Sequence, residues 1–286
     1  MLADAVRSES YRLLKNRTAV FWSVFFVPIM GLAISIFSFF LIKSKAEQMV
    51  GKLPAELSFG GPLDLGAALA ANAGNLANPA TLGFLLIGAA TLYAGDYRWE
   101  TWRLISARNT RPNLLLGKVG VVKLLTMAAM LIFLLTASMA DVAKATIFDR
   151  PMTFTFGAEQ AADFGLLFLL SFVRVVQFLM ISLLAAVVTR SLLAALFVPL
   201  VLGVAQFFLG GPLAGPLGLE PGAWITHLLL PGSAYDVLKT LTTGGIEAAA
   251  MPDGLAIKAI TSLALWSLVP LAAAIAWFSR QDLSKE

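Results

Sequence analysis

Residues 95–118 read GDYRWETWRLISARNTRPNLLLGK, and this stretch decides how the rest of the chain is interpreted. It holds five basic residues, two tryptophans and only two acids, and the chain on both sides of it becomes almost wholly apolar. Lysine and arginine accumulate on the cytoplasmic side of membrane proteins. A basic connection between two long apolar segments therefore predicts a cytoplasmic turn, and we expect another molecule to dock on it.

The composition is that of a membrane protein. Hydrophobic residues make up 58% of the chain, charged residues 13%, and the mean hydropathy is +0.82. Soluble domains carry about 25% charged residues. The net charge of +4 is spread over short loops, which is a topology signal and not a nucleic-acid signal. We expect a single membrane domain over residues 1–286.

Six apolar runs are long enough to cross the bilayer as helices, since about 20 residues span its hydrocarbon core. They cover residues 19–42, 76–95, 119–140, 164–188, 192–209 and 256–278. Basic residues gather before the first run, in the connecting segment (residues 96–118), at Arg190 and after the last run. Their density places both termini and the connecting segment in the cytoplasm. The sequence thus predicts an all-α, six-span, multi-pass protein of the cell (inner) membrane.

Shorter helices are expected outside the spans. Residues 1–18 are basic and amphipathic, so they form either an interfacial helix, which we favour, or a solvated arm. Residues 63–73 are compatible with a short helix. Residues 223–230 and 233–241 are apolar but too short to span, which predicts a pair of re-entrant helices between spans 5 and 6.

The chain lacks the motifs of membrane enzymes. It has no cysteine and one histidine, His227, which we interpret as a packing residue rather than a ligand. No P-loop, H-E-x-x-H or G-x-S-x-G motif occurs. The predicted spans contain no Asp or Glu, whereas proton- and sodium-coupled carriers usually keep titratable acids there. We therefore expect no catalytic site and no metal, and any uphill transport would draw its energy from another subunit.

One charge lies inside a predicted span. Arg174 is ten residues into the fourth span, close to mid-bilayer, and Ser171, Arg174 and Gln177 share one helical face. Two interpretations remain open. The stripe, with Gln206 of the next span, could line a substrate pathway, or Arg174 could be structural, bonded to carbonyls, to Gln206 or to a neighbouring subunit.

The connecting segment also allows two interpretations. It could be a solvated basic loop that only sets the topology. Trp99, Trp102 and Ile105 nevertheless give it an apolar face, which a topology signal alone would not need.

The segment resembles the corresponding part of ABC-2 type transporter permeases. In that family an acid ends the second span, and a basic-aromatic pair, Gly-Thr, an aliphatic stretch and an arginine lead to a Gly-Lys that opens the third span. Here Asp96 is followed by Arg98-Trp99, Glu100-Thr101, Leu104-Ile105, Arg108 and Arg111, and then by Gly117-Lys118. Glu100 stands where glycine is usual, which bears on the tightness of the turn, and Asp96 stands where glutamate is usual, which preserves the charge. The opening stretch SESYRLLKNRTAVFW, the six spans and the helical insertion before the last span are similar as well.

The resemblance implies the permease subunit of an ATP-driven exporter. Such a subunit pairs with a second permease copy, in a homodimer or heterodimer, and with two separate ATP-binding subunits, which hold ATP and Mg²⁺. The connecting segment would then be the coupling helix, whose arginines suit an acidic groove and whose tryptophans suit an anchor. The residues expected to contact the ATPase are Asp96, Arg98, Trp99, Glu100, Thr101, Trp102, Arg103, Arg108 and Arg111.

Two functions from different classes follow. The first is an exporter subunit whose cargo is hydrophobic or amphipathic, such as a drug, a peptide or a lipid-like molecule. The second is a membrane-anchored assembly or sensor protein whose connecting segment binds a partner that is not an ATPase. An integral membrane enzyme is a third possibility, which the missing catalytic cluster argues against.

Overall fold

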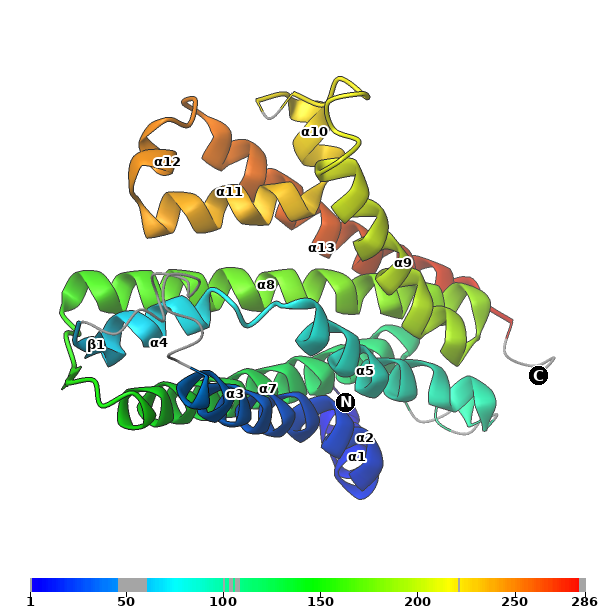
Figure 1. Ribbon diagram of the computed structural model, residues 1–286. Coiled ribbons are helices and arrows are strands. Elements are labelled where there is room, and N and C mark those ends of the chain that lie inside the picture. Colours follow the sequence, from blue (N-terminus) through cyan, green and yellow to red (C-terminus); the bar gives the residue numbers. More distant parts are fainter. Residues whose placement is uncertain are drawn as a thin grey trace.

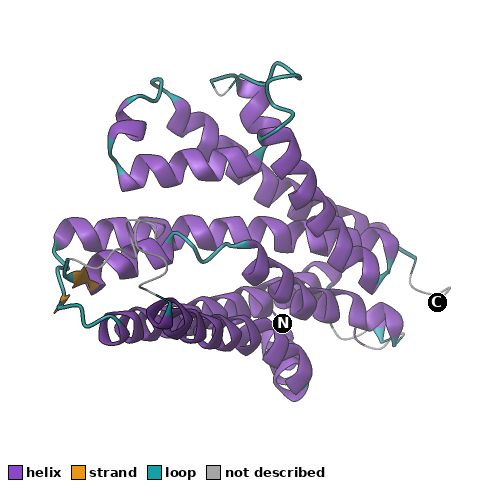
Figure 2. Cartoon of the chain, viewed as in Figure 1, coloured by secondary structure: helices purple, strands orange, loops and turns teal. Residues whose placement is uncertain are grey.

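The computed structural model describes residues 2–45, 61–99, 101, 102, 105, 109–220 and 222–282. This part of the chain is built almost entirely of helices (Figure 2). Five of its helical stretches are long and apolar enough to cross a membrane: Arg17–Ser44, Arg111–Ile147, Ala158–Thr189, Leu192–Gly210 and Leu255–Arg280. The chain is therefore an all-α protein with the helices of a multi-pass membrane protein.

The elements follow one another as a series of long helices with short ones between them. In chain order they are α1 (Leu2–Lys15), α2 (Arg17–Val20), a π-helix η1 (Phe21–Phe26), α3 (Val27–Ser44), β1 (Leu63–Asp64), α4 (Leu65–Ala73), α5 (Pro79–Arg98), α7 (Arg111–Ile147), β2 (Met152–Thr153), α8 (Ala158–Thr189), α9 (Leu192–Gly210), α10 (Trp224–Leu229), α11 (Pro231–Thr243), α12 (Ile246–Ala249) and α13 (Leu255–Arg280).

Five predicted spans coincide with the five long apolar stretches, although α7 extends well beyond the predicted 119–140 at both ends. The predicted second span, 76–95, corresponds to the 20-residue helix α5, which is not one of the five. It begins at Pro79 because the Asn78 side chain caps it, accepting a bond from the Thr81 amide at 2.9 Å. Its last turn carries Asp96 and Arg98, which lower its hydropathy. Six spans therefore remain a prediction.

Helix α8 is the centre of the molecule. In Figure 1 it lies across the middle, with α11 and α13 on one side and α4, α5 and α7 on the other, and it packs on each of these helices and on α9. Its apolar stretch is the most deeply buried of the five. By contrast, the stretch Arg17–Ser44 packs along α7 at the edge of the bundle and contains few buried residues.

One end of the bundle is closed by loops around a minimal sheet. Strands β1 and β2 are parallel and two residues long, with Leu63 opposite Met152, and they are an element that the all-α prediction did not contain. Asp64 caps α4 by accepting a bond from the Gly66 amide at 2.8 Å, and it also accepts from the Thr155 amide at 3.0 Å and from the Thr155 hydroxyl. It thereby joins the loop before α4 to the loop after α7.

At the opposite end, α1 and the residues after α13 both contact the last turn of α5. Helix α1 packs on α7 and reaches the last turn of α5 through Arg12, and the Tyr97 hydroxyl of that turn donates to Gln281, just after α13, at 3.0 Å. The Gln281 amide in turn donates to the Val187 carbonyl of α8 at 2.7 Å. The predicted helices 1–18, 223–230 and 233–241 correspond in position to α1, α10 and α11.

The first span starts with an irregular turn. Residues Phe21–Phe26 form the π-helix η1, whose rings Trp22 and Phe26 pack on Phe84 of α5 at centroid distances of 5.8 and 4.7 Å. Gly88 of α5 lies against Ser23, and a Cβ at Gly88 would come within 2.4 Å of the Ser23 hydroxyl oxygen. Only glycine allows α5 to approach η1 so closely.

Candidate functional site

Four charged side chains meet where α1, α5 and α7 converge, and we call Glu9, Arg12, Asp96 and Lys118 the charge cluster. The Lys118 ammonium lies 2.5 Å from an Asp96 carboxylate oxygen and 3.1 Å from Glu9. The Arg12 guanidinium donates to both oxygens of Asp96, at 2.7 and 3.2 Å, and to Glu9 at 3.0 Å. Two cations thus balance two carboxylates.

The helix surfaces explain how these groups meet. Glu9 lies on the same face of α1 as Ala5 and Leu13, at steps of four residues, and all three are buried. That face packs on α7 at Gly117, where an added Cβ would lie 2.8 Å from the Cβ of Ala5. Gly117 therefore lets α1 come close enough for Glu9 to reach Lys118, the next residue of α7.

Because these charged groups are buried, the arrangement is stable only when all four side chains are present. Asp96 and Lys118 have no exposed surface and Glu9 is 3% exposed. A buried charge is tolerated when it is paired and hydrogen-bonded, and removing one partner typically costs about 3–5 kcal/mol. Burial alone would lower the pKa of Arg12, but its bonds to Asp96 and its attraction to Glu9 raise that pKa above the ordinary value, so Arg12 keeps its charge.

The cluster reaches into the connecting segment. The Thr101 hydroxyl donates to Asp96, and the Lys118 ammonium, which also donates to the Leu92 carbonyl at 3.0 Å, lies 5.2 Å from the centre of the Trp102 ring. Trp102 has no exposed surface. Its ring packs on Phe278 of α13 at a centroid distance of 4.5 Å. The beginning of the segment is therefore held in the bundle by a charge contact and by aromatic packing.

The end of the segment is also held. Arg111, the first residue of α7, donates to the carbonyl oxygens of Phe278, Ser279 and Gln281 at 3.2, 3.2 and 2.6 Å. Carbonyls at a helix carboxyl end lack partners within the helix and favour a nearby cation. Arg111 thus caps α13 and ties the start of α7 to the last helix.

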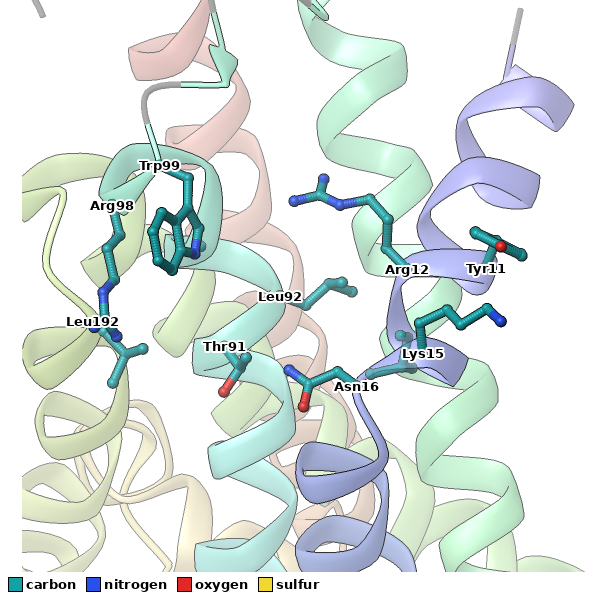
Figure 3. Close-up of a pocket in the computed structure, with 11 residues that line it drawn as sticks. Tyr11, Arg12, Lys15, Asn16, Thr91, Leu92, Arg98, Trp99 and Leu192 are labelled. Carbon is teal, nitrogen blue, oxygen red and sulfur yellow. The ribbon is translucent and has the colours of Figure 1, made fainter.

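Arg98 and Trp99 differ from their neighbours because both are exposed, Trp99 by 69%. The Arg98 guanidinium lies 5.3 Å from the centre of the Trp99 ring. Figure 3 shows these two side chains on one side of a pocket of about 340 Å³, opposite Arg12 and Asn16. Among the described residues that line this pocket, none is a carboxylate. The pocket therefore offers cations and an aromatic ring to a visiting group.

The residues predicted to touch a partner thus divide into three sets. Arg98 and Trp99 are exposed as such a role requires. Asp96 and Trp102 are buried, while Thr101 and Arg111 bond within the chain, so the structure places these four in positions that hold the segment rather than on its outer face. Glu100, Arg103 and Arg108 lie outside the described residues. Residues 111–118, which we assigned to the segment, are the first turns of α7.

Arg174 and Gln177, from the predicted polar stripe on α8, lie together with Gln206 of α9. The Arg174 guanidinium donates to the side-chain oxygens of Gln177 at 3.2 Å and of Gln206 at 3.0 Å, and it lies 4.7 Å from the centre of the Phe178 ring. Gln177 donates to the Leu263 carbonyl of α13 at 3.4 Å. The structural interpretation of Arg174, which named Gln206 as its partner, accounts for these contacts.

Ser171 takes part in a separate contact with α11. Its hydroxyl donates to the Ala73 carbonyl at 2.8 Å and lies 3.0 Å from the Tyr235 hydroxyl, which donates to the Gly74 carbonyl at 3.0 Å. The next residue of α11, Asp236, is an exposed carboxylate on a helix that packs against α8. Asp236 lies outside the predicted spans, so the absence of acids within those spans gave no sign of it.

His227 has no exposed surface and lies where α10 packs on α13. Its carbonyl accepts a bond from Ser262 at 2.5 Å. Among the described residues no three His, Cys, Asp or Glu side chains are grouped as metal ligands would be.

Comparisons of the chain with protein-family models, curated proteins and solved structures find no match.

Proposed function

We propose that this chain is the membrane-spanning permease subunit of an ATP-driven exporter. In this proposal α5 is the second of six spans, both termini are cytoplasmic, and α10 and α11 form the re-entrant pair. The chain works with a second permease copy and with two ATP-binding subunits, which hold ATP and Mg²⁺. Its cargo is hydrophobic or amphipathic, because the polar groups of α8 are engaged in contacts with α9, α11 and α13.

The observation that carries the proposal is the position of Arg98 and Trp99. They are exposed at the end of α5, directly beside Asp96 and Trp102. Asp96 is ion-paired with α1 and α7, and Trp102 packs on α13. A partner that pushes on the exposed pair therefore pushes on four helices at once. Rigid transmission of this kind is what an ATPase needs to rock the spans between two states.

The pocket beside this pair supports a docking role. A partner side chain that enters it meets Arg98 and Trp99 and comes next to Arg12 of the charge cluster. Aromatic and arginine side chains carry much of the energy of protein interfaces. The charges favour an acidic partner surface.

The first test is purification of the tagged chain from its host in mild detergent, with mass spectrometry of co-purifying proteins. We expect a stoichiometric protein with a P-loop, which is lost when Arg98→Glu is combined with Trp99→Ala. The matched control combines Lys45→Glu with Phe154→Ala, which changes an exposed cation and an exposed ring at the other end of the bundle. Recovery of a partner without a P-loop would favour the assembly or sensor protein instead.

A further inference from the structure

A second cavity lies between the carboxyl ends of α8 and α13, and we call it the α8–α13 groove. Its volume is about 450 Å³. Val188, Ala273 and Ala276 form apolar walls, while Arg190, Trp277 and Arg280 stand around it. The proposed function uses none of these residues.

The chemistry of the groove changes along its length. Ala273 and Ala276 are one turn apart on α13, and their small side chains leave room beside the helix. Trp277 is 53% exposed and follows directly. Arg190 and Arg280, both exposed, end the two helices. From Ala273 towards Arg280 the groove presents apolar walls, then a tryptophan and then two cations. The acyl chain, the interface and the phosphate follow one another in the same order across a lipid leaflet.

Two contacts that do not depend on a ligand join the ends of α8 and α13 beside the groove. The Gln281 side chain, which also lines it, donates to the Val187 carbonyl at 2.7 Å, and Arg190 donates to the Asp282 carbonyl at 3.3 Å. The Gln281 bond fixes the end of α13 against the end of α8 and remains when Arg190 is replaced. No carboxylate is among the described residues that line the groove.

Arg190 also has an unusual backbone. Its φ is +57°, in the left-handed region that glycine and asparagine enter more easily than arginine. Helices commonly end with a residue in this region, and Arg190 ends α8 in this way. Here the turn directs a cation to the rim of the groove at the point where α8 leaves the apolar region.

We propose that the α8–α13 groove binds one anionic glycerophospholipid, with its phosphate near Arg190 and Arg280 and an acyl chain along Ala273 and Ala276. A zwitterionic lipid has the same chains and phosphate but no net charge, so it binds more weakly. This proposal is independent of the exporter function, because it concerns a different face of the bundle.

The test is native mass spectrometry of the delipidated full chain titrated with phosphatidylglycerol or phosphatidylcholine. We expect the wild-type protein to prefer phosphatidylglycerol. The double variant Arg190→Gly with Arg280→Gln should bind it about 30-fold more weakly, because it lacks two basic groups that attract an anionic lipid. Arg190→Gly relieves the backbone strain, so the variant is expected to fold. The control, Arg7→Gln with Arg17→Gln, removes two exposed cations near the same end and should bind as the wild type does.

A second pair of variants tests the acyl-chain part. Ala273→Leu fills the groove and should weaken binding without changing the charge, whereas Ala272→Leu, on the neighbouring exposed face of α13, should not. Equal binding of the two lipids, or unchanged binding in the arginine double variant, would overturn the proposal. Displacement of the lipid by millimolar inorganic phosphate would also overturn it, because the groove would then be a site for free anions.

Discussion

Lys118 has three acceptors for its three protons, namely Asp96, Glu9 and the Leu92 carbonyl, and no contact with solvent. Replacement by methionine keeps much of the volume but leaves two carboxylates with Arg12 alone. We expect Lys118→Met to reduce the free energy of unfolding by about 3–5 kcal/mol. Denaturant unfolding in detergent measures this difference.

The control for this prediction is Lys123→Met, one and a half turns further along α7, where the lysine is partly exposed. It should change the free energy of unfolding by less than about 1 kcal/mol. Equal effects of the two substitutions would show that the charge cluster does not stabilise the fold.

A second prediction at the scale of single residues concerns Asp64. The Thr155 hydroxyl and amide, followed by the amides of α4, lower the pKa of Asp64 to about 2 from the usual 3.8. A carboxyl with a lowered pKa stabilises the folded state above its unfolded pKa, and this contribution disappears as the pH falls through about 2. Asp64→Asn should therefore loosen the loop 148–157 at pH 4 but make no difference below pH 2.

Pepsin cleavage near the exposed Phe154 measures that loosening. The ratio of the cleavage rates of the variant and the wild-type protein removes the pH dependence of pepsin itself. We expect a ratio above one at pH 4 that approaches one near pH 2. A ratio that does not change with pH would mean that the ionised Asp64 does not hold the two loops together.

At the scale of elements, the contact between α1 and α7 depends on one glycine. A Cβ at Gly117 would lie 2.8 Å from the Cβ of Ala5 and 3.1 Å from its carbonyl carbon, so Gly117→Ala must push α1 away. At Gly120, one turn on, the nearest atom would be a Val6 methyl at 3.6 Å, an ordinary contact. We expect Gly117→Ala to destabilise the protein by about 1–3 kcal/mol.

Gly120→Ala is the matched control, and it should be neutral or stabilising by up to about 1 kcal/mol because alanine is the better helix former. Unfolding in denaturant measures both variants. If Gly117→Ala proves as stable as Gly120→Ala, α1 does not pack on α7 as closely as described, and Glu9 would lose its route to Lys118.

At this scale the sequence predicted the long helices but not the contacts between them. The long helices were predictable because length and hydropathy depend only on neighbouring residues. The charge cluster was not, because Arg12 and Asp96 are 84 residues apart and Glu9 and Lys118 are 109 apart. The sequence held one signal of the cluster, because Glu9 is a charged residue on the otherwise apolar face formed by Ala5 and Leu13. The same distance effect hid the bond between Ser171 and the Ala73 carbonyl, 98 residues away.

At the scale of the whole molecule, the chain has two ends of different character. One carries Arg12, Arg98, Arg111, Arg190 and Arg280, while the other is closed by mixed-charge contacts such as Lys43 with Asp149 at 2.9 Å. The excess of basic residues predicts that the first end faces the cytoplasm.

Single cysteines test this orientation, because the natural chain has none. Thr110 and Phe154 are exposed at the two ends. A membrane-impermeant maleimide added to right-side-out vesicles should label the Phe154→Cys protein but label the Thr110→Cys protein only after detergent is added. The reverse pattern would invert the proposed topology.

The π-helix at Phe21–Phe26 has a consequence for how this sequence tolerates change. Its wide turn accommodates an extra residue relative to an α-helix. Deleting one residue there would restore the α-helical hydrogen-bond pattern and leave α2 in nearly the same rotational phase, because the wide turn absorbs the extra residue. A deletion within the regular helix α3 would instead rotate α2 by about 100° relative to the end of the span, and Ala19, now buried, would leave its contact. The π-helix is thus a place in the span where the number of residues can change without turning the N-terminal helices.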